Sequence, residues 1–147
     1  MSKQLKLKIV TPEKLILEEQ VDQVTIPTTE GELTILPNHI SMIAQLSSGD
    51  VVARNSGEDI PMAVSGGFVE VKQTDGETQV AILADYAEHV VDITEDTIKK
   101  AIARAEELKK QAENKEIVDF EHFESELERN LTRVKIADKW RKKKYRI

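Results

Sequence analysis

The residues best suited to chemistry in this chain are three histidines and one serine that precedes two glycines. His39, His89 and His122 lack the H-x-x-x-H spacing of a metal site. The chain contains no cysteine, which excludes disulfides, thiolate metal ligands and a cysteine nucleophile. It also contains neither a phosphate-binding G-x-x-x-x-G-K-(S/T) loop nor a G-x-S-x-G nucleophile elbow. The common catalytic motifs are therefore missing.

The segment Ser65-Gly66-Gly67 is better explained by backbone geometry than by a nucleophile. Two adjacent glycines are typical of a turn in which φ is positive. The acidic residues are scattered, so no pair of them can be assigned the roles of general acid and base. His39 follows Pro37 and Asn38, so we expect it in an exposed loop, where an interface role and no role at all have equal weight and a catalytic role is disfavoured. The sequence predicts that the chain is not an enzyme on its own.

The charge pattern near the C-terminus is more informative. Residues 119–128 carry five acidic side chains and no basic one, whereas residues 129–147 carry nine basic side chains and one acidic one, Asp138. The basic residues are Arg129, Arg133, Lys135, Lys139, Arg141, Lys142, Lys143, Lys144 and Arg146. A helix dipole favours cations only within about one turn of the helix end, so it accounts for some of these charges and not for all. Two interpretations have equal weight: a solvated tail, and an electrostatic arm for an acidic partner.

Nucleic acid and membrane are poor candidates for that partner. Residues 1–90 hold 6 basic and 14 acidic side chains, whereas a nucleic-acid-binding protein usually has a basic domain. The basic tail lacks the broad apolar face that binds a membrane surface. The longest stretch without a charged residue, 33–49, is broken by Pro37 and by polar residues, so it cannot span a bilayer. With no apolar signal-peptide core at its N-terminus, the chain is expected to be soluble and to stay where it is made.

Glycine and proline divide the chain into two regions. All six glycines and all four prolines of the 147 residues precede residue 77, and both residue types are poor in helix interiors. Before that point apolar residues alternate with polar ones, as in Leu5, Leu7 and Ile9, and turn-forming segments separate the alternating runs. We count about eight to ten short strands, with a spacing typical of a β-sandwich or barrel. Helical crossovers are absent, which argues against a parallel sheet.

Two amphipathic helices are predicted after residue 92. Thr94 and Asp119 are good N-caps for the first and second helix, and Ile93 and Ile98 have the spacing of a hydrophobic staple. A mostly alanine stripe marks the first helix: Ile98, Ala101, Ala105, Leu108 and Ala112. The apolar face of the second is Phe120, Phe123, Leu127, Leu131, Val134 and Ala137. The short polar break at residues 114–116 predicts an antiparallel helical hairpin.

Three segments resemble the epsilon subunits of bacterial and chloroplast rotary (F-type) ATP synthases. They are Gly31-Glu32-Leu33-Thr34-Ile35-Leu36-Pro37-Asn38-His39, Ala63-Val64-Ser65-Gly66-Gly67-Phe68-Val69-Glu70-Val71, and Ala81-Ile82-Leu83-Ala84 followed by Ala87-Glu88. Their order and spacing agree with that family, and the resemblance covers nearly the whole chain. It implies a β + α fold, with an N-terminal antiparallel β-sandwich of about ten short strands in two sheets and a C-terminal antiparallel helical hairpin. The implied division is a rotor-binding sandwich in residues 1–86, a linker in 87–91 and a regulatory hairpin in 92–147.

The resemblance also implies a function, that of a non-catalytic central-stalk subunit in the rotor of the proton-translocating F1Fo ATP synthase. The sandwich would couple the gamma subunit to the c-subunit ring, with Glu32 at the family position that faces the c-ring and His39 at the position that lies against gamma. The hairpin would inhibit ATP hydrolysis when it extends into the alpha/beta catalytic head. Its basic arm would then meet an acidic segment of the beta subunit; the arm is Arg129, Arg133, Lys135, Lys139, Arg141, Lys142, Lys143 and Lys144. The implied location is peripheral, on the cytoplasmic face of the bacterial cell membrane within the F1 sector, although a plastid-encoded copy would look the same.

The chain departs from the family pattern at several positions. Thr34 and Asn38 stand where glycine is usual, and asparagine tolerates positive φ, so Asn38 can keep the turn. The family's nucleotide-binding motif (I/L)-D-x-x-R-A is replaced by residues 93–98, Ile-Thr-Glu-Asp-Thr-Ile, while Arg104 matches a second family arginine. One cation without its partners is a thin basis for a phosphate site. We expect no cofactor, and weak or absent ATP binding by the isolated chain.

Two rival interpretations stay open. The chain could be a free-standing sensor that binds a small ligand between sandwich and hairpin, or a generic adaptor with no rotary partner. A ligand-dependent thermal shift would favour the sensor. Co-purification with gamma and catalytic subunits would exclude both rivals.

Overall fold

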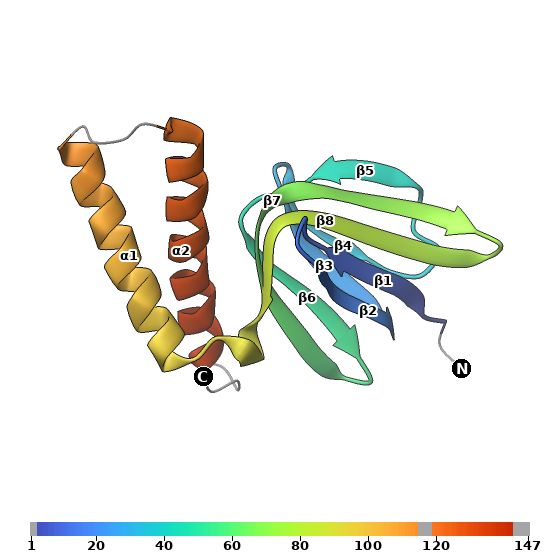
Figure 1. Cartoon of the computed structure of the whole chain (residues 1–147). Coiled ribbons are helices and arrows are strands. Elements are labelled where there is room, and N and C mark those ends of the chain that lie inside the picture. The colour runs from blue at the N-terminus through green and yellow to red at the C-terminus, as the bar shows by residue number, and fades with distance from the viewer. Residues whose placement is uncertain (1–2, 115–118, 143–147) are drawn as a thin grey trace. The chain divides into compact units, whose positions relative to one another are not determined.

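The computed structural model describes residues 3–114 and 119–142. Figure 1 traces eight β-strands, one 3-10 helix and two α-helices through these residues. The strands are β1 (Leu5–Val10), β2 (Leu15–Val21), β3 (Gln23–Thr28), β4 (Gly31–Ile35), β5 (Met42–Gln45), β6 (Gly49–Asn55), β7 (Glu58–Thr74) and β8 (Glu77–His89). The helices are η1 (Val90–Asp92), α1 (Glu95–Glu113) and α2 (Phe120–Arg141). The chain divides into two compact units, Met1–His89 and Val90–Ile147.

The first unit is built from one hydrogen-bonded sheet that folds over on itself. Its strand order is β2-β1-β8-β7-β6-β3-β4, and β5 pairs with β7. The two longest strands, β7 and β8, belong to both layers: the first half of β7 pairs with β6, and its second half pairs with β5. Both strands bend along their length, and the sheet closes into a β-sandwich (Figure 1). The predicted fold class, a β-sandwich followed by a helical hairpin, is confirmed.

The bend in β7 falls at the two adjacent glycines. Gly66 and Gly67 have φ values of 70° and 117°, in the region that side chains rarely adopt. A Cβ atom on Gly67 would lie 2.0 Å from the carbonyl oxygen of Leu83, so no larger residue fits there. The expected positive φ is confirmed, but the glycines bend one long strand instead of joining two short ones. For this reason the described residues form eight strands, two of them long, and not about ten short strands.

One strand pair departs from the expected antiparallel arrangement. β1 and β8 run parallel, with Leu7 opposite Val80 and Ile9 opposite Ile82. The other strand pairs in the described residues are antiparallel. The absence of helical crossovers did not exclude parallel pairing of β1 with β8. The connection between these two strands is made by about seventy residues that include β2 to β7, and not by a helix. The sheet is therefore mixed.

Alternation along the strands sets the core of the sandwich. Leu5, Leu7 and Ile9 on β1 are fully buried, and the lysines between them face outward. The core cluster draws on β1, β2, β3, β4, β6, β7 and β8, and it lies entirely within the first unit. Burying one such aliphatic side chain stabilises the fold by about 1.5–3 kcal/mol. The first unit thus has a hydrophobic core of its own.

The second unit is the predicted antiparallel hairpin of α1 and α2. The Thr94 hydroxyl accepts a hydrogen bond from the Thr97 amide, and the Asp119 carboxylate accepts one from the His122 amide, so both predicted N-caps are confirmed. Ala101, Ala105 and Leu108 of the predicted α1 stripe are buried, whereas Ala112 is exposed. The two helices pack along each other, as expected of a hairpin.

The predicted apolar face of α2 is partly wrong. Phe120 is 61% exposed and Leu131 is 44% exposed, while Phe123, Leu127 and Val134 are half-buried. The buried residues of α2 are Asn130, Thr132, Ile136, Ala137 and Trp140, and of these only Ala137 belongs to the predicted face. Glu126 and Arg141 of α2 form ion pairs with α1.

The junction between the units falls at the end of β8. Residues 87–91 comprise the last three residues of β8 and the first two of η1, and the two units divide between His89 and Val90.

Candidate docking surfaces

An exposed row of apolar side chains crosses the sheet of the first unit. Strand register places Leu15 beside Val10, Val10 beside Leu83, and Leu83 beside Phe68. Leu15, Leu83 and Phe68 are 52–54% exposed, and their strand neighbours point into the core. We call Leu15, Val10, Leu83 and Phe68 the apolar row. Four hydrophobic residues in register on the outside of a sheet are typical of a protein-binding surface.

A groove lies against this row at the bend of β7. It has a volume of about 480 Å³ and is lined by Phe68, Leu83, Val10 and Pro12 together with the glycines of the bend. Asp85 and Gln45 supply polar groups at its wall. The groove gives the apolar row a concave neighbour into which a partner side chain can fit.

A second exposed apolar feature is the loop after β4. Leu36 is 53% exposed and Ile40 is 75% exposed, and Ile43 on the following strand is 70% exposed. His39, which was expected to be exposed, is half-buried in this loop, and its Nδ1 lies 2.8 Å from the carbonyl oxygen of Ile40. The loop folds back on itself, which turns the imidazole toward the backbone and leaves the apolar side chains outermost.

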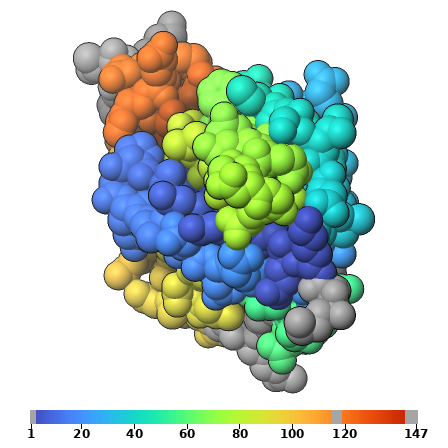
Figure 2. Space-filling view, turned by 90° about the vertical axis from the view of Figure 1, so that its right-hand side faces the viewer, coloured from blue at the N-terminus to red at the C-terminus, as the bar shows by residue number. Residues whose placement is uncertain are grey.

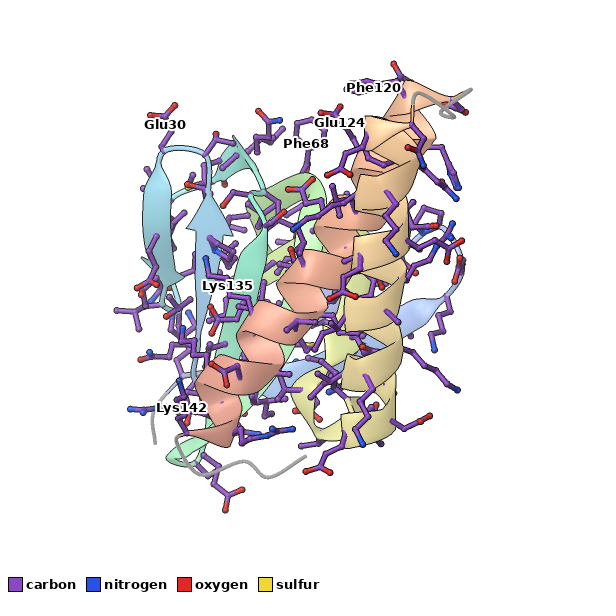
Figure 3. The ribbon with its side chains drawn as sticks, turned by 90° about the vertical axis from the view of Figure 1, so that its left-hand side faces the viewer. Glu30, Phe68, Phe120, Glu124, Lys135 and Lys142 are labelled. Carbon is purple, nitrogen blue, oxygen red and sulfur yellow. The ribbon has the colours of Figure 1, made fainter. Side chains whose placement is uncertain are left out.

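Glu32 and His39, the two sandwich residues singled out in the sequence, are not brought together. Glu32 is exposed on β4 beside the β3–β4 turn, opposite Pro27. His39 follows the other end of β4. Glu30 lies at the tip of the turn, so this end of the sandwich carries two carboxylates, as Figure 3 shows for Glu30. The two predicted contact residues belong to two separate surfaces.

The basic arm of α2 is divided by its surroundings. Lys135, Lys139, Arg141 and Lys142 are exposed, whereas Arg129 and Arg133 are half-buried. Figure 3 shows Lys135 and Lys142 on the C-terminal half of α2 and Glu124 near its N-terminal end. Lys143 and Lys144, also assigned to this arm, lie outside the described residues.

Several cations of the arm have partners within the hairpin. The Lys142 ammonium lies 3.2 Å from the Asp138 carboxylate, and Arg141 lies 4.0 Å from Glu95 of α1. The Lys139 ammonium lies 5.8 Å from the centre of the Trp140 ring. These exposed pairs contribute little stability. An acidic partner can therefore replace them at low cost.

Arg104 connects the two helices through an ion pair with Glu126. Its Nε and Nη2 atoms donate to both carboxylate oxygens of Glu126 on α2, at 2.7–3.2 Å. Its Nη1 lies 3.1 Å from Glu107, one turn further along α1. The Asn130 side chain donates to the Glu126 carbonyl oxygen at 2.8 Å, beside this ion pair. Arg104, the one candidate for nucleotide binding, is thus bonded to protein carboxylates.

These contacts shift the ionisation of both partners. Hydrogen bonds from Arg104 hold the pKa of Glu126 below its usual value; partial burial opposes the shift, and the positive charges of Arg104, His122 and Arg129 add to it. The same pairing raises the pKa of Arg104. Both groups are charged at neutral pH, so the pair is intact there.

The described residues offer no catalytic centre of a familiar kind. Among them, no three histidine, aspartate or glutamate side chains gather to hold a metal ion. The Ser65 hydroxyl is buried and lies 3.2 Å from the Ser48 hydroxyl, so it has a structural contact. None of the described helices is long and apolar enough to cross a membrane. The prominent surface features are those of a binding protein.

Two functional features escaped sequence reasoning. The apolar row joins residues from four strands, and its members are neighbours only once the register is known. The Arg104–Glu126 pair joins residues 22 positions apart on two helices. The sequence carried a signal only for the apolar row, because its hydrophobic residues stand at the polar positions of alternating strands.

Comparison with known proteins gives consistent matches. A family model described as "ATP synthase, Delta/Epsilon chain, beta-sandwich domain" matches residues 4–90. A protein from Nitratidesulfovibrio vulgaris strain DP4 named "ATP synthase epsilon chain" is 41% identical over 136 residues, which is 92% of this chain and 97% of that protein. A protein of the same name from Halalkalibacterium halodurans is 41% identical over 133 residues, 90% of this chain and 96% of that protein.

Solved structures agree with the fold. A chain in the Euglena gracilis mitochondrial ATP synthase structure, titled for its OSCP/F1/c-ring part, aligns with a TM-score of 0.64 and 26% identity, covering 88% of this chain and 78% of that one. A chain in the central stalk/c-ring structure of the Tetrahymena thermophila mitochondrial ATP synthase aligns with a TM-score of 0.54 and 16% identity, over 95% and 97%. The second likeness concerns the fold alone.

Proposed function

This chain belongs to the family of ATP synthase delta/epsilon chains, and from that premise we propose that it is a non-catalytic central-stalk subunit of a rotary ATP synthase. The observation that carries the proposal is the 41% identity to an epsilon chain over 92% of this chain, which spans both the sandwich and the hairpin. The solved relative from Euglena belongs to an assembly that includes F1 and the c-ring. The proposed partners are accordingly the gamma subunit, the c-subunit ring and the alpha/beta head.

The surfaces of the sandwich support docking to a rotor. The apolar row offers Phe68 and Leu83 for the dry centre of an interface. The acidic end, with Glu30 and Glu32, is a separate surface suited to a more polar partner. In the proposed assignment the apolar row and the His39 loop bind gamma, and the end with Glu32 faces the c-ring.

The hairpin is proposed to inhibit ATP hydrolysis by leaving its closed form and extending into the catalytic head. Its helix contact supports such a change, because the α1 side is mostly alanine and buries little apolar area. The 22 residues of α2 form a helix of about 33 Å at about 1.5 Å per residue, long enough to reach a distant site. The exposed cations Lys135, Lys139 and Lys142 would then meet an acidic segment of the beta subunit.

The remaining assignments follow from this role. The chain itself is proposed to make or break no bonds and to bind ATP weakly or not at all, because Arg104 is held by Glu126. Its proposed place is peripheral, on the cytoplasmic face of the bacterial membrane, as part of the F1 sector.

Co-purification tests the proposal. A tagged full-length chain, expressed in its source cell, is expected to bring down gamma and the catalytic subunits. The variant Leu83→Lys places a charge in the apolar row and is expected to lose most of the bound gamma. Thr34→Lys is the matched control, because Thr34 is an exposed strand residue outside the row; it is expected to bind as wild type.

Two results would count against the proposal. Absence of gamma from the wild-type preparation would exclude the central-stalk role. In that event a ligand-dependent thermal shift of the isolated chain would favour the sensor interpretation. Binding of gamma by Leu83→Lys as tightly as by wild type would show that the apolar row lies outside the interface.

A further inference from the structure

The loop that carries His39 is fixed by side chains from a different part of the sandwich. It follows β4 and presents Leu36 and Ile40, which are 53% and 75% exposed. Exposed hydrophobic side chains on a loop bind a partner well only when the loop is already held in one conformation, because ordering it on binding costs conformational entropy. Residues 36–40, which we call the docking loop, must therefore be held in place by contacts with other parts of the sandwich.

The main constraint is a chain of hydrogen bonds from the tip of the β7–β8 hairpin. The main-chain amide of Asn38 donates a hydrogen bond to the Thr78 hydroxyl at 2.7 Å. That hydroxyl donates a hydrogen bond to the side-chain oxygen Oε1 of Gln73 at 2.9 Å. The Gln73 side-chain NH₂ then donates back to the main-chain carbonyl of His39. Gln73 and Thr78 face each other across the β7–β8 hairpin. Two neighbouring peptide groups of the docking loop are thus tied to one pair of side chains.

The position of Thr78 suits it to this role. Its side chain is fully buried although it stands one residue from the hairpin turn. The Thr78 hydroxyl accepts one hydrogen bond and donates another, so it uses its one proton and one of its two lone pairs. Figure 2 shows the tip of the β7–β8 hairpin, in yellow-green, beside the cyan surface of the segment near residue 40. The hydroxyl is therefore the link between the hairpin tip and the loop.

The loop conformation needs such support. Asn38 has a φ of 72°, a left-handed conformation that costs energy for any residue other than glycine. The Lys3 ammonium donates to the Asn38 side-chain oxygen at 2.9 Å, which adds a third contact. Without these contacts the strained residue can relax and move Ile40 away from its present position.

We propose that Thr78 and Gln73 are positioning residues that hold the docking loop in the conformation bound by the rotor partner. They need not touch the partner themselves. This inference rests on the proposed function, and it adds that affinity for gamma depends on a buried hydroxyl at the hairpin tip. The interface is thereby pre-organised, with Ile40 as its apolar contact.

The test compares binding of full-length variants to F1 that has been depleted of this subunit. Thr78→Val removes the hydroxyl at nearly constant volume and is expected to weaken binding about tenfold, as expected for the loss of one or two hydrogen bonds. Thr78→Ser keeps the hydroxyl and is expected to bind as wild type. Thr25→Val is the matched control, because it removes one hydroxyl–hydroxyl contact of 2.9 Å, to Thr34, elsewhere on the sandwich.

A double-mutant cycle separates positioning from general destabilisation. In an Ile40→Ser background the loop no longer carries its apolar contact, so Thr78→Val is expected to cause little further loss. A purely structural effect would weaken binding by the same factor in both backgrounds. Amide hydrogen exchange at Asn38 gives a direct readout, with faster exchange expected in Thr78→Val and not in Thr25→Val.

Each outcome decides something. If wild type fails to bind depleted F1, the proposed function itself fails. If wild type binds and Thr78→Val binds equally tightly, the positioning role is wrong. If Thr78→Val does not fold, Gln73→Ala replaces it, because Gln73 is exposed and its loss frees the His39 carbonyl without disturbing the core; wild-type affinity in that variant would overturn the inference.

Discussion

The guanidinium of Arg104 on α1 bonds both carboxylate oxygens of Glu126 on α2, with N–O distances of 2.7–3.2 Å. The Glu126 side chain is 19% exposed and the Arg104 side chain 40% exposed, so the pair is only partly screened by water. Bidentate pairs of this kind are stronger and more directional than a lysine–carboxylate contact. In a hairpin whose contact is rich in alanine, this pair is a main determinant of which residues of the two helices face each other.

Removing the carboxylate should loosen the hairpin. Glu126→Gln leaves Arg104 without its bidentate partner and is expected to destabilise the helical unit by about 1–2 kcal/mol. Thermal unfolding of the full chain, followed by the helical circular dichroism signal, measures this change. Under the proposed function the variant also favours the extended form, so ATP hydrolysis by the reconstituted complex should be inhibited more strongly.

Two controls accompany this variant. Asp96→Asn removes the i,i+4 pair with Lys100, in which both side chains are at least 75% exposed, and should change stability by only a few tenths of a kcal/mol. The exchange Arg104→Glu with Glu126→Arg should recover part of the lost stability. A Glu126→Gln effect no larger than that of Asp96→Asn would show that the pair does not hold the helices together.

The contribution of Glu126 should depend on pH in a defined direction. Arg104 lowers the pKa of Glu126 in the folded chain, so its stabilising effect is complete above the ordinary glutamate pKa of about 4.3 and is lost as the pH falls through the lowered value. Arg104 and Glu107 of α1, with His122 and Arg129 of α2, are the charged groups that act around it. The stability difference between wild type and Glu126→Gln should therefore be largest at neutral pH and shrink below about pH 4.

Thermal unfolding of both proteins between pH 3 and pH 7 checks this direction. The comparison of the two proteins at each pH cancels the acid sensitivity of the remaining carboxylates. A difference that stays constant, or grows as the pH falls, would contradict the assigned ion pair.

The sandwich should fold and bind without the hairpin. Its core cluster lies within the first unit, which ends at His89. A chain of residues 1–91 is therefore expected to keep a cooperative unfolding transition and to bind gamma, while inhibition of ATP hydrolysis weakens. Binding to gamma measures the first expectation, and the ATPase rate of the reconstituted complex measures the second. Failure of residues 1–91 to bind gamma would refute this division of roles.

Local features of the fold could be predicted from the sequence because their causes are local. Thr94 and Asp119 cap their helices as expected, since a capping side chain bonds an amide only three residues away. The alternation of Leu5, Leu7 and Ile9 located β1 for the same reason. Asn38 has the positive φ that was expected, as its residue type allows.

Features that depend on distant residues could not be predicted in this way. The parallel pairing of β1 with β8 and the contact of Asn38 with Thr78 join positions far apart in the chain. The buried residues of α2 differ from its predicted apolar face, because the apolar period alone cannot reveal that Glu126 finds a partner on α1. Most of the residues that define the proposed interfaces are positioned by such contacts between distant parts of the chain.

The isolated chain should bind ATP weakly or not at all. Arg104, the candidate nucleotide-binding residue, is already bonded to Glu126 and lies 3.1 Å from Glu107. Isothermal titration of wild type is expected to give no micromolar binding. Glu126→Gln removes the bidentate partner of Arg104 and is therefore the informative comparison. A gain of ATP binding in that variant alone would show that the ion pair prevents binding in wild type. A micromolar dissociation constant for wild type would contradict the prediction.

Charge reversal in the basic arm distinguishes an electrostatic contact from a solvated tail. Lys142, Lys143 and Lys144 changed together to glutamate should relieve inhibition of ATP hydrolysis, and the inhibition that remains should respond less to salt, because screening acts on the removed attraction. The matched control reverses Lys99, Lys109 and Lys110, three exposed lysines of α1, and produces the same change in net charge. ATPase assays of the reconstituted complex at low and high salt make the measurement. If both triple variants inhibit like wild type at each salt concentration, the arm makes no contact with an acidic partner and its cations serve only as a solvated helix end.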